Sequence, residues 1–358
     1  MDIRDKSFQI NLLREISLRN ENSNVVLSPL SCYLALALCA NGAKDDTLTE
    51  MIHCLSPNAK DLTELNENSI KVTKVLSAFE SVKIANAILT VSSITKEFKE
   101  KGKEYNAMVD QLKSLSQVNT WCKEKTNGKI TEIIDSIMGV ELLILNAVYF
   151  LGKWQIEFNR YISIEEFTLL SGEKRKCEMM SMTEELYYFG NKNYEMCKLN
   201  YKENDLCAYI ILPLSENINE FIKTFTQEFF ENSVRILRKG TVLLTLPKFE
   251  LNSYIDLKAV LQCMGIRKAF FKGDFTNMVQ NQTLNIGEIV QKCFIKVDEK
   301  GTEAAAVTAI SAEKSACGGG GKSIFILHVN RPFLFVIANE DMLNNVIFYA
   351  KVIDPNTK

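Results

Sequence analysis

Hydrophobic and polar residues follow two periods along the chain, and together these periods predict an α+β fold. Helical spacing of apolar residues occurs at 6–19, 31–40, 119–134 and 255–264, and more loosely at 56–78. Extended apolar runs predict strands at 82–91, 142–150, 187–189, 197–200, 206–212, 241–246, 289–297, 324–329, 332–338 and 346–352. The run at 142–150, LLILNAVYF, is almost wholly apolar, which is typical of a strand buried on both faces. Helices and strands do not alternate regularly, which favours an α+β class.

Length and composition narrow the class of protein. At ~150 residues per domain, 358 residues would favour two domains, but the sequence has no internal repeat and no clear linker. A hydrophobic content of 46% with 24% charged residues is typical of a globular protein and excludes a disordered chain. The net charge is only -2, so we expect neither nucleic acid nor an anionic membrane as a partner. No charge-free apolar run reaches the ~18 residues of a transmembrane helix.

Residues that could carry catalysis are few. Nucleophilic catalysis needs a positioned base, and the chain has only two histidines, His53 and His328. We expect His53 to be a partly exposed packing residue and His328 to be structural, because it lies in a predicted strand. Zinc-protease, nucleophile-elbow and P-loop motifs are absent. A dinucleotide-binding site needs its glycine-rich turn between a strand and a helix. The four glycines at 318–321 follow no predicted strand and precede no predicted helix. We therefore expect no enzyme and no cofactor.

The ten cysteines indicate a cellular compartment rather than a metal site. None of them forms a CxxC pair, so the spacing of zinc ligands is missing and we expect no metal. Asp2, Arg4 and Asp5 interrupt the segment in which an export signal would be apolar. We expect free thiols in a reducing compartment. This favours a cytoplasmic protein, or an extracellular one released without a leader.

The segment 301–317, GTEAAAVTAISAEKSAC, is unusual for a globular protein. Its alternate residues Thr302, Ala304, Ala306 and Thr308 are all small, and in a strand they would share one face. Such a face can enter an occupied sheet without overpacking it. Alanine also favours helix, but a short helix without an apolar stripe would be marginal. The sequence therefore predicts a segment that can change its conformation, followed by a flexible glycine run.

Seven motifs in one order resemble the serpin family, and the resemblance covers nearly the whole chain. The motifs lie at 24–31 (NVVLSPLS), 119–130, 146–158, 246–249 (LPKF), 274–278 (DFTNM), 298–306 (DEKGTEAAA) and 330–335 (NRPFLF). The resemblance implies one domain, residues 1–358, built on a large central, mostly antiparallel sheet. Further sheets and surrounding helices complete this α+β serpin fold, and an exposed reactive-centre loop is implied at about 299–323.

The resemblance also implies a function, the inhibition of serine proteases by a suicide-substrate mechanism. In serpins the protease forms an acyl-enzyme with the loop, and the cut loop then inserts into the main sheet as an extra strand. The native fold is metastable, and the trapped protease deacylates too slowly to escape. The implied partner is an elastase-, chymotrypsin- or trypsin-like serine protease, and the implied state is a monomer.

Individual residues take roles from the same resemblance. The implied hinge residues are Glu299, Gly301, Thr302, Glu303, Ala304, Ala305 and Ala306. The family places the reactive bond after the seventeenth residue counted from the hinge glutamate, which gives Ser315 and Ala316. A small residue there suits an elastase-like protease. Lys314 is the alternative and suits a trypsin-like pocket, and Lys322 is a third candidate.

The resemblance also implies two further groups of residues, called the breach and the shutter. Trp154, Lys248 and Glu299 resemble the breach, where the loop enters the sheet, and Lys248 with Glu299 resembles its salt bridge. The shutter lies beneath the sheet and is implied to contain Ser28, Ser31, Asn146 and Gln291. The family usually has histidine where this chain has Gln291. Glutamine both donates and accepts hydrogen bonds, so the network can survive the change.

Two other functions stay open at the level of the sequence. A non-inhibitory serpin would act as a chaperone or carrier, and an inhibitor could also target a cysteine protease. Non-inhibitory members tend to have bulky, charged or proline residues at positions 302 and 304–306. The small residues of this chain therefore favour inhibition.

Overall fold

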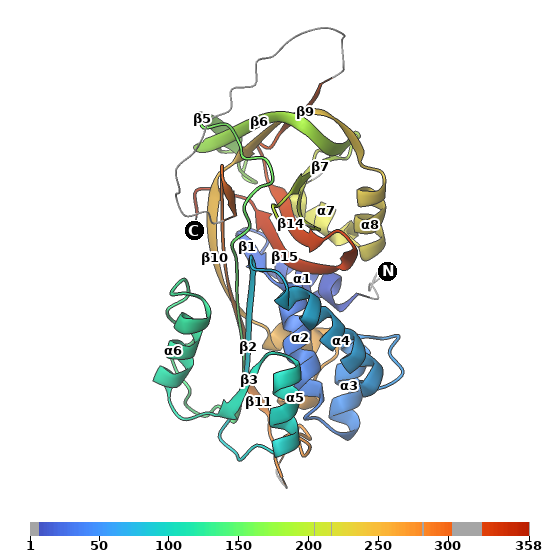
Figure 1. Cartoon of the computed structure of the whole chain (residues 1–358), viewed down its shortest axis with the longest axis vertical. Helices are drawn as coiled ribbons and strands as arrows, with labels where there is room; N and C mark the ends of the chain where they lie inside the picture. The colour runs from blue at the N-terminus through green and yellow to red at the C-terminus, as the bar shows by residue number, and fades with distance from the viewer. Residues whose placement is uncertain (1–6, 204, 216, 281–282, 303–323, 358) are drawn as a thin grey trace.

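The computed structural model describes residues 7–203, 205–215, 217–280, 283–302 and 324–357. The α-helices of these ranges are α1 (Phe8–Arg19), α2 (Pro29–Ala40), α3 (Asp45–Leu55), α4 (Leu62–Ser77), α5 (Lys96–Glu104), α6 (Leu115–Lys125), α7 (Ile218–Thr224), α8 (Gln227–Arg235) and α9 (Lys258–Met264). A 3-10 turn, η1, covers Lys268–Phe270. The strands form two sheets, and both layers carry helices on their outer faces (Figure 1).

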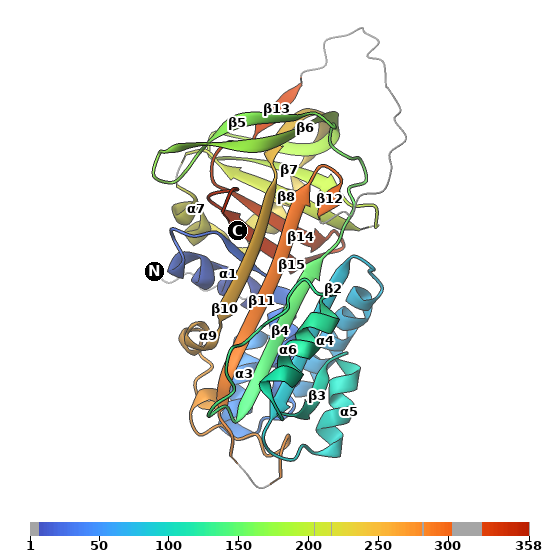
Figure 2. The same cartoon turned by 90° about the vertical axis from the view of Figure 1, so that its left-hand side faces the viewer.

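A six-stranded sheet runs along the length of the molecule (Figure 2). Its strands, in spatial order, are β10 (Phe249–Asp256), β11 (Ile286–Asp298), β4 (Leu142–Phe150), β2 (Val82–Thr90) and β3 (Met108–Gln111), with β12 (Gly301–Thr302) on β11. The central pair, β4 and β11, is parallel, as is β2 with β3. The other three pairings are antiparallel.

A nine-stranded sheet lies mainly in the half of the molecule that is drawn at the top of Figure 1. Its order is β1 (Val25–Leu27), β15 (Met342–Val352), β14 (Phe333–Asn339), β8 (Leu206–Pro213), β7 (Tyr194–Asn200), β6 (Lys174–Gly190), β9 (Arg238–Pro247) and β13 (Phe325–His328), with β5 (Ile162–Thr168) on β6. Phe150 of β4 lies 6.0 Å from the ring of Phe348 of β15, so the two sheets share one core. Antiparallel pairs predominate, and the predicted α+β class is confirmed.

Helices cover both faces of the six-stranded sheet. On one face, Val118 and Trp121 of α6 pack on Leu143 and Leu145 of β4. On the other lies α2, which is apolar on nearly every side, as expected of a helix surrounded by protein. Ser28 caps α2, because its hydroxyl accepts from the backbone N–H of Ser31 at 3.4 Å. At 12 residues α2 is too short to cross a membrane, and no other helix in the described ranges combines sufficient length with sufficient apolarity.

Three of the predicted helical segments are too long, and the loosely periodic one at 56–78 corresponds to α4, Leu62–Ser77. The predicted helix at 119–134 ends at Lys125, because Asn127 and Gly128 adopt the left-handed φ values of 50° and 78°. Side chains hold the chain that follows: Asn119 Oδ1 accepts from the N–H of Ile133 at 2.9 Å. The predicted helix at 255–264 begins only at Lys258, since residues 255 and 256 continue β10 on β11.

Candidate functional site

The predicted hinge lies at one end of the six-stranded sheet, where its two central strands diverge (Figure 2). The parallel strands β4 and β11 pair as far as Tyr149 and Phe294. Beyond that point the chain turns back after β11 as β12, which pairs with the end of β11. On its other side, the N–H of Thr302 donates to the carbonyl of Gly152 at 2.7 Å. The start of the loop is therefore seated between β11 and the chain that leaves β4.

Gly301 is required by this close approach. A Cβ at this position would overlap the carbonyl oxygen of Gly152 and lie 2.8 Å from the Cα of Lys153. Thr302 is buried next to it, and its hydroxyl shares a 2.7 Å hydrogen bond with the hydroxyl of Tyr201. The hinge glycine and the small residue after it are thus explained by packing between two backbones.

Trp154 holds the two sides of this entrance together. Its ring stacks on Tyr201 with centroids 4.5 Å apart and planes 16° apart. The indole Nε1 donates to the carbonyl of Asp298 at 3.0 Å, and the backbone N–H donates to the carbonyl of Lys300 at 3.0 Å. Trp154 therefore fixes the end of β11 through its buried side chain and the turn into the hinge through its backbone.

Lys248 and Glu299 form the predicted ion pair, with Nζ and Oε2 3.3 Å apart. Lys248 also lies 3.2 Å from Glu178. Burial acts against the charge of Glu299, but its own backbone N–H and the charge of Lys248 lower the pKa of the carboxyl below its ordinary value. Burial likewise opposes the charge of Lys248, but the two carboxylates raise its pKa. The structure thus brings Trp154, Lys248 and Glu299 together at the entrance.

Replacing Glu299 with glutamine should lower the free energy of unfolding by about 1 kcal/mol at pH 7, because the pair is partly exposed. The folded-state pKa lies below the ordinary 4.5, so the contribution is complete above that pH and disappears as the pH falls through the lower value. Urea unfolding at pH 7 and at pH 3 measures it. Glu104→Gln, which removes a surface pair with Lys101, is the control. An equal loss at both pH values would contradict the assignment.

A buried hydrogen-bond network crosses the β4–β11 pair halfway along its length. Gln291 and Asn146 are register partners, and Gln291 Nε2 donates to Asn146 Oδ1. Gln291 also accepts from the N–H of Ser28 and donates to its carbonyl, both at 2.9 Å. Asn146 Nδ2 in turn donates to Ser31 Oγ. The four predicted shutter residues are therefore joined by hydrogen bonds. Separating β4 from β11 would break the bond between the side chains of Asn146 and Gln291.

Sequence reasoning missed two members of this network, Asn86 and Cys32. Asn86 of β2 accepts from Asn146 Nδ2 and from Ser31 Oγ, the latter at 3.4 Å. Cys32 Sγ accepts from Gln291 Nε2 at 3.0 Å. The sequence did hold a signal for Asn86, since it is the one amide within the otherwise apolar stretch 84–89, IANAIL. A buried strand tolerates such a residue only with hydrogen-bond partners.

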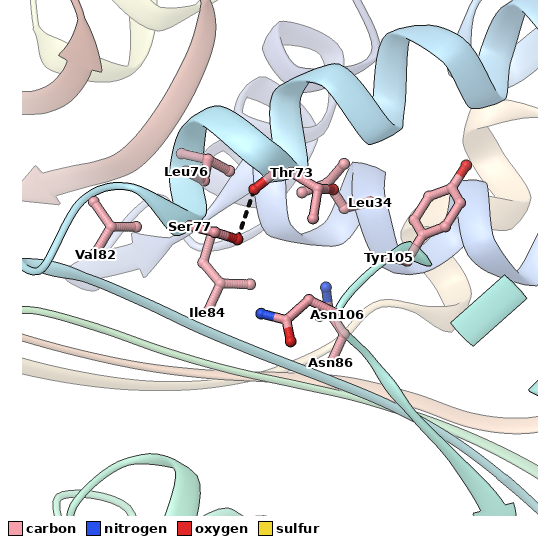
Figure 3. Close-up of a pocket in the computed structure, with 9 residues that line it drawn as sticks. All are labelled: Leu34, Thr73, Leu76, Ser77, Val82, Ile84, Asn86, Tyr105 and Asn106. Atoms are coloured by element: carbon pink, nitrogen blue, oxygen red, sulfur yellow. Dashed lines mark hydrogen bonds between the residues drawn. The ribbon is translucent and has the colours of Figure 1, made fainter. Parts of the chain in front are cut away.

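Asn86 also lines a pocket between β2 and helix α4 (Figure 3). Thr73 and Leu76 of α4 line the pocket from one side, and Ile84 and Asn86 of β2 line it from the other. Asn86 therefore belongs both to the lining of this pocket and to the hydrogen-bond network that joins the central strands.

The other predicted hinge and reactive-bond residues cannot be placed. Glu303, Ala304, Ala305, Ala306, Lys314, Ser315, Ala316 and Lys322 lie outside the described residues. His328 Nε2 lies 3.0 Å from Glu165 Oε2 at the surface, and His53 is exposed on α3. Among the described residues, no group of His, Cys, Asp and Glu is arranged to hold a metal ion.

Comparison with known proteins gives the family. Residues 4–355 match the family described as "Serpin (serine protease inhibitor)". Serpin A3-1 of Bos taurus is 30% identical over 373 residues, covering 98% of this chain and 88% of that protein. Serpin B9 of Homo sapiens is also 30% identical, with 98% of each protein covered.

Solved structures agree. The thermophilic serpin tengpin in its native state superposes with a TM-score of 0.88 at 30% identity, covering 98% of this chain and 93% of that one. Thyroxine-binding globulin in complex with thyroxine superposes equally well, at 0.88, over 98% of each chain. Its identity is only 22%, so that likeness concerns the fold alone. By sequence and by structure, this chain belongs to the serpin family.

Proposed function

We propose that this chain inhibits serine proteases by covalent trapping, followed by insertion of the cut loop between β4 and β11. The observation that carries the proposal is the position of the hinge. Gly301 and Thr302 already form a two-residue strand on β11, at the place where β4 and β11 separate. Continuing that strand towards Gln291 would place Ala304 and Ala306 on the same face as Thr302.

The energetic driving force is the arrangement of the central strands. β4 and β11 are parallel, and parallel pairs are slightly less stable per residue than antiparallel ones. A strand that continues β12 would be antiparallel to both and would form a ladder of hydrogen bonds on each side. Every residue of β4 is buried, so the new strand must also carry small side chains. The alanine-rich sequence after Thr302 meets that requirement.

The trapping chemistry uses the protease's own nucleophile. Its serine oxygen attacks the carbonyl carbon of Ser315, the bond to the nitrogen of Ala316 breaks, and that nitrogen leaves as a protonated amine. The product is an ester that water would normally hydrolyse. Insertion of the loop before this hydrolysis displaces the protease and stops the reaction. A cysteine protease would form a thioester at the same carbon, so this class of target remains an alternative.

A panel of proteases tests the proposal. The protein is incubated with elastase, chymotrypsin, trypsin and a cathepsin-type cysteine protease, and complexes that resist denaturant are separated on a gel. We expect at least one such complex, with release of a C-terminal peptide that begins at Ala316. A peptide that begins at Ser315 would instead assign the bond to Lys314.

Active-site-blocked proteases are the control, because they should give neither complex nor peptide. Cleavage of the loop without a stable complex by every protease would contradict inhibition and favour a carrier or chaperone role. We also propose a reducing, cytoplasmic site of action, with an extracellular site as the alternative. The nine cysteines in the described residues are free thiols, which supports this location.

A further inference from the structure

An apolar surface is exposed beside the point where the described chain resumes after residue 323. Ile324 is 57% exposed and Ile326 of β13 is 63% exposed. The next residues along the strand lie on its other face: the ring of Phe325 is 4.6 Å from that of Tyr188, although Phe325 is still 40% exposed, and Leu327 is fully buried. Leu327 and the ring contact of Phe325 with Tyr188 thus hold this segment on one face, and the opposite face displays the two isoleucines.

This surface continues onto the neighbouring strand. β13 ends the strand order of the nine-stranded sheet and pairs with β9 among the described strands. Leu243 of β9 is the register partner of Ile326 and is only partly buried. We name Ile324, Ile326 and Leu243 the β13 patch. An exposed apolar patch on a sheet edge favours unwanted association, so its presence indicates a partner that covers it.

We infer that the β13 patch contacts the body of the target protease and contributes to the choice of target; the inference rests on the proposed function. Ile324 follows Ala316 by eight residues, which span at most about 28 Å. A protease domain of ~200 residues has a radius of gyration of about 16 Å. A protease holding the bond before Ala316 therefore has its surface within reach of the patch. The favoured protease carries an apolar or aromatic area beside its cleft, and a charged area there is disfavoured.

Binding of an inactive protease tests this inference. The probe is elastase, chymotrypsin or trypsin, whichever cleaves the loop fastest, with its nucleophilic serine changed to alanine. We expect Ile326→Asp to weaken the dissociation constant at least tenfold and Ile326→Thr about threefold. Met138→Asp is the control, because Met138 is 91% exposed on the loop between α6 and β4 and should leave binding unchanged. A thermal midpoint equal to that of wild type establishes that a variant is folded. If Ile326→Asp does not fold, the test uses Ile326→Thr instead.

The outcomes separate this inference from the proposed function. An inactive protease cannot be trapped, so its affinity reports the contact even if active proteases only cleave the loop. Binding of Ile326→Asp within twofold of wild type would overturn the inference. It would also be overturned if the substitution abolished self-association in sedimentation and left protease binding unchanged, because the patch would then serve a second copy of this chain.

Discussion

Replacing Ala304 by arginine should convert the protein from an inhibitor into a substrate. In the proposed insertion, Ala304 would share with Thr302 the face that enters between β4 and β11, and both of these strands are largely buried. A guanidinium forced into that space would lose its hydration without gaining a partner. Insertion should then be slower than hydrolysis of the acyl-enzyme. We expect the yield of denaturant-resistant complex to fall at least tenfold, while cleavage of the loop stays as fast as in wild type.

Ala305→Arg is the matched control, because its side chain belongs to the opposite face in an extended strand. It should retain clearly more complex than Ala304→Arg. Thr302→Arg is a less clear test, since Thr302 is already buried against Tyr201 and an arginine there would disturb the uncut protein. Complex yield and the number of inhibitor molecules consumed per trapped protease measure the effect. An Ala304→Arg variant that traps protease as efficiently as wild type would contradict insertion along this path.

Replacing Gln291 by alanine should cause the largest loss of stability. Its amide satisfies the N–H and the carbonyl of Ser28 and the side-chain oxygen of Asn146, all in a buried position. Each buried polar group left without a partner costs ~1–3 kcal/mol, and a cavity adds to the cost. We expect a loss of about 3–5 kcal/mol in the free energy of unfolding, measured by urea titration. We also expect the central strands to part more readily.

Lys292→Ala serves as the control on the adjacent residue. The Lys292 side chain is directed away from the network, and its Nζ donates to the carbonyl of Glu132 at 2.6 Å near the surface. Its removal should cost less than about 1 kcal/mol. A similar small cost for Gln291→Ala would mean that the network does not hold β4 and β11 together.

The fold could be predicted where side-chain periodicity and burial agree. Residues 142–150 were predicted as a buried strand and form β4 with those bounds. The helix predicted at 119–134 ends at Lys125, because Asn119 and Thr126 accept hydrogen bonds from the N–H groups of Ile133 and Ile130 and so stabilise an irregular chain whose apolar residues lie at helical intervals. Short elements such as β3 and α7 gave no pattern of their own, since they depend on neighbours distant in the sequence.

The residues of the site could be predicted from family motifs, but not from the periodicity or the chemistry of the sequence. The ion pair of Lys248 with Glu299 joins residues 51 positions apart, and no periodicity relates them. The same holds for Gln291 and Ser28, which meet only because β11 passes over the first turn of α2. Asn86 was missed although a buried amide in an apolar strand demands partners, and its partners could be identified only from the structure. The reactive bond lies outside the described residues, so Ser315 and Ala316 stay predictions.

The central claim is that the uncut chain has not reached its most stable state. Cleaving the loop within residues 303–323 with a protease that is not trapped, and then comparing thermal unfolding of cut and uncut protein, tests this directly. An inserted strand that gains about ten hydrogen bonds would add about 10 kcal/mol. At the ~1.3 °C per kcal/mol expected of a chain of 358 residues, the cut protein should unfold about 13 °C above the uncut one. A midpoint that stays equal or falls after cleavage would contradict loop insertion and the trapping mechanism built on it.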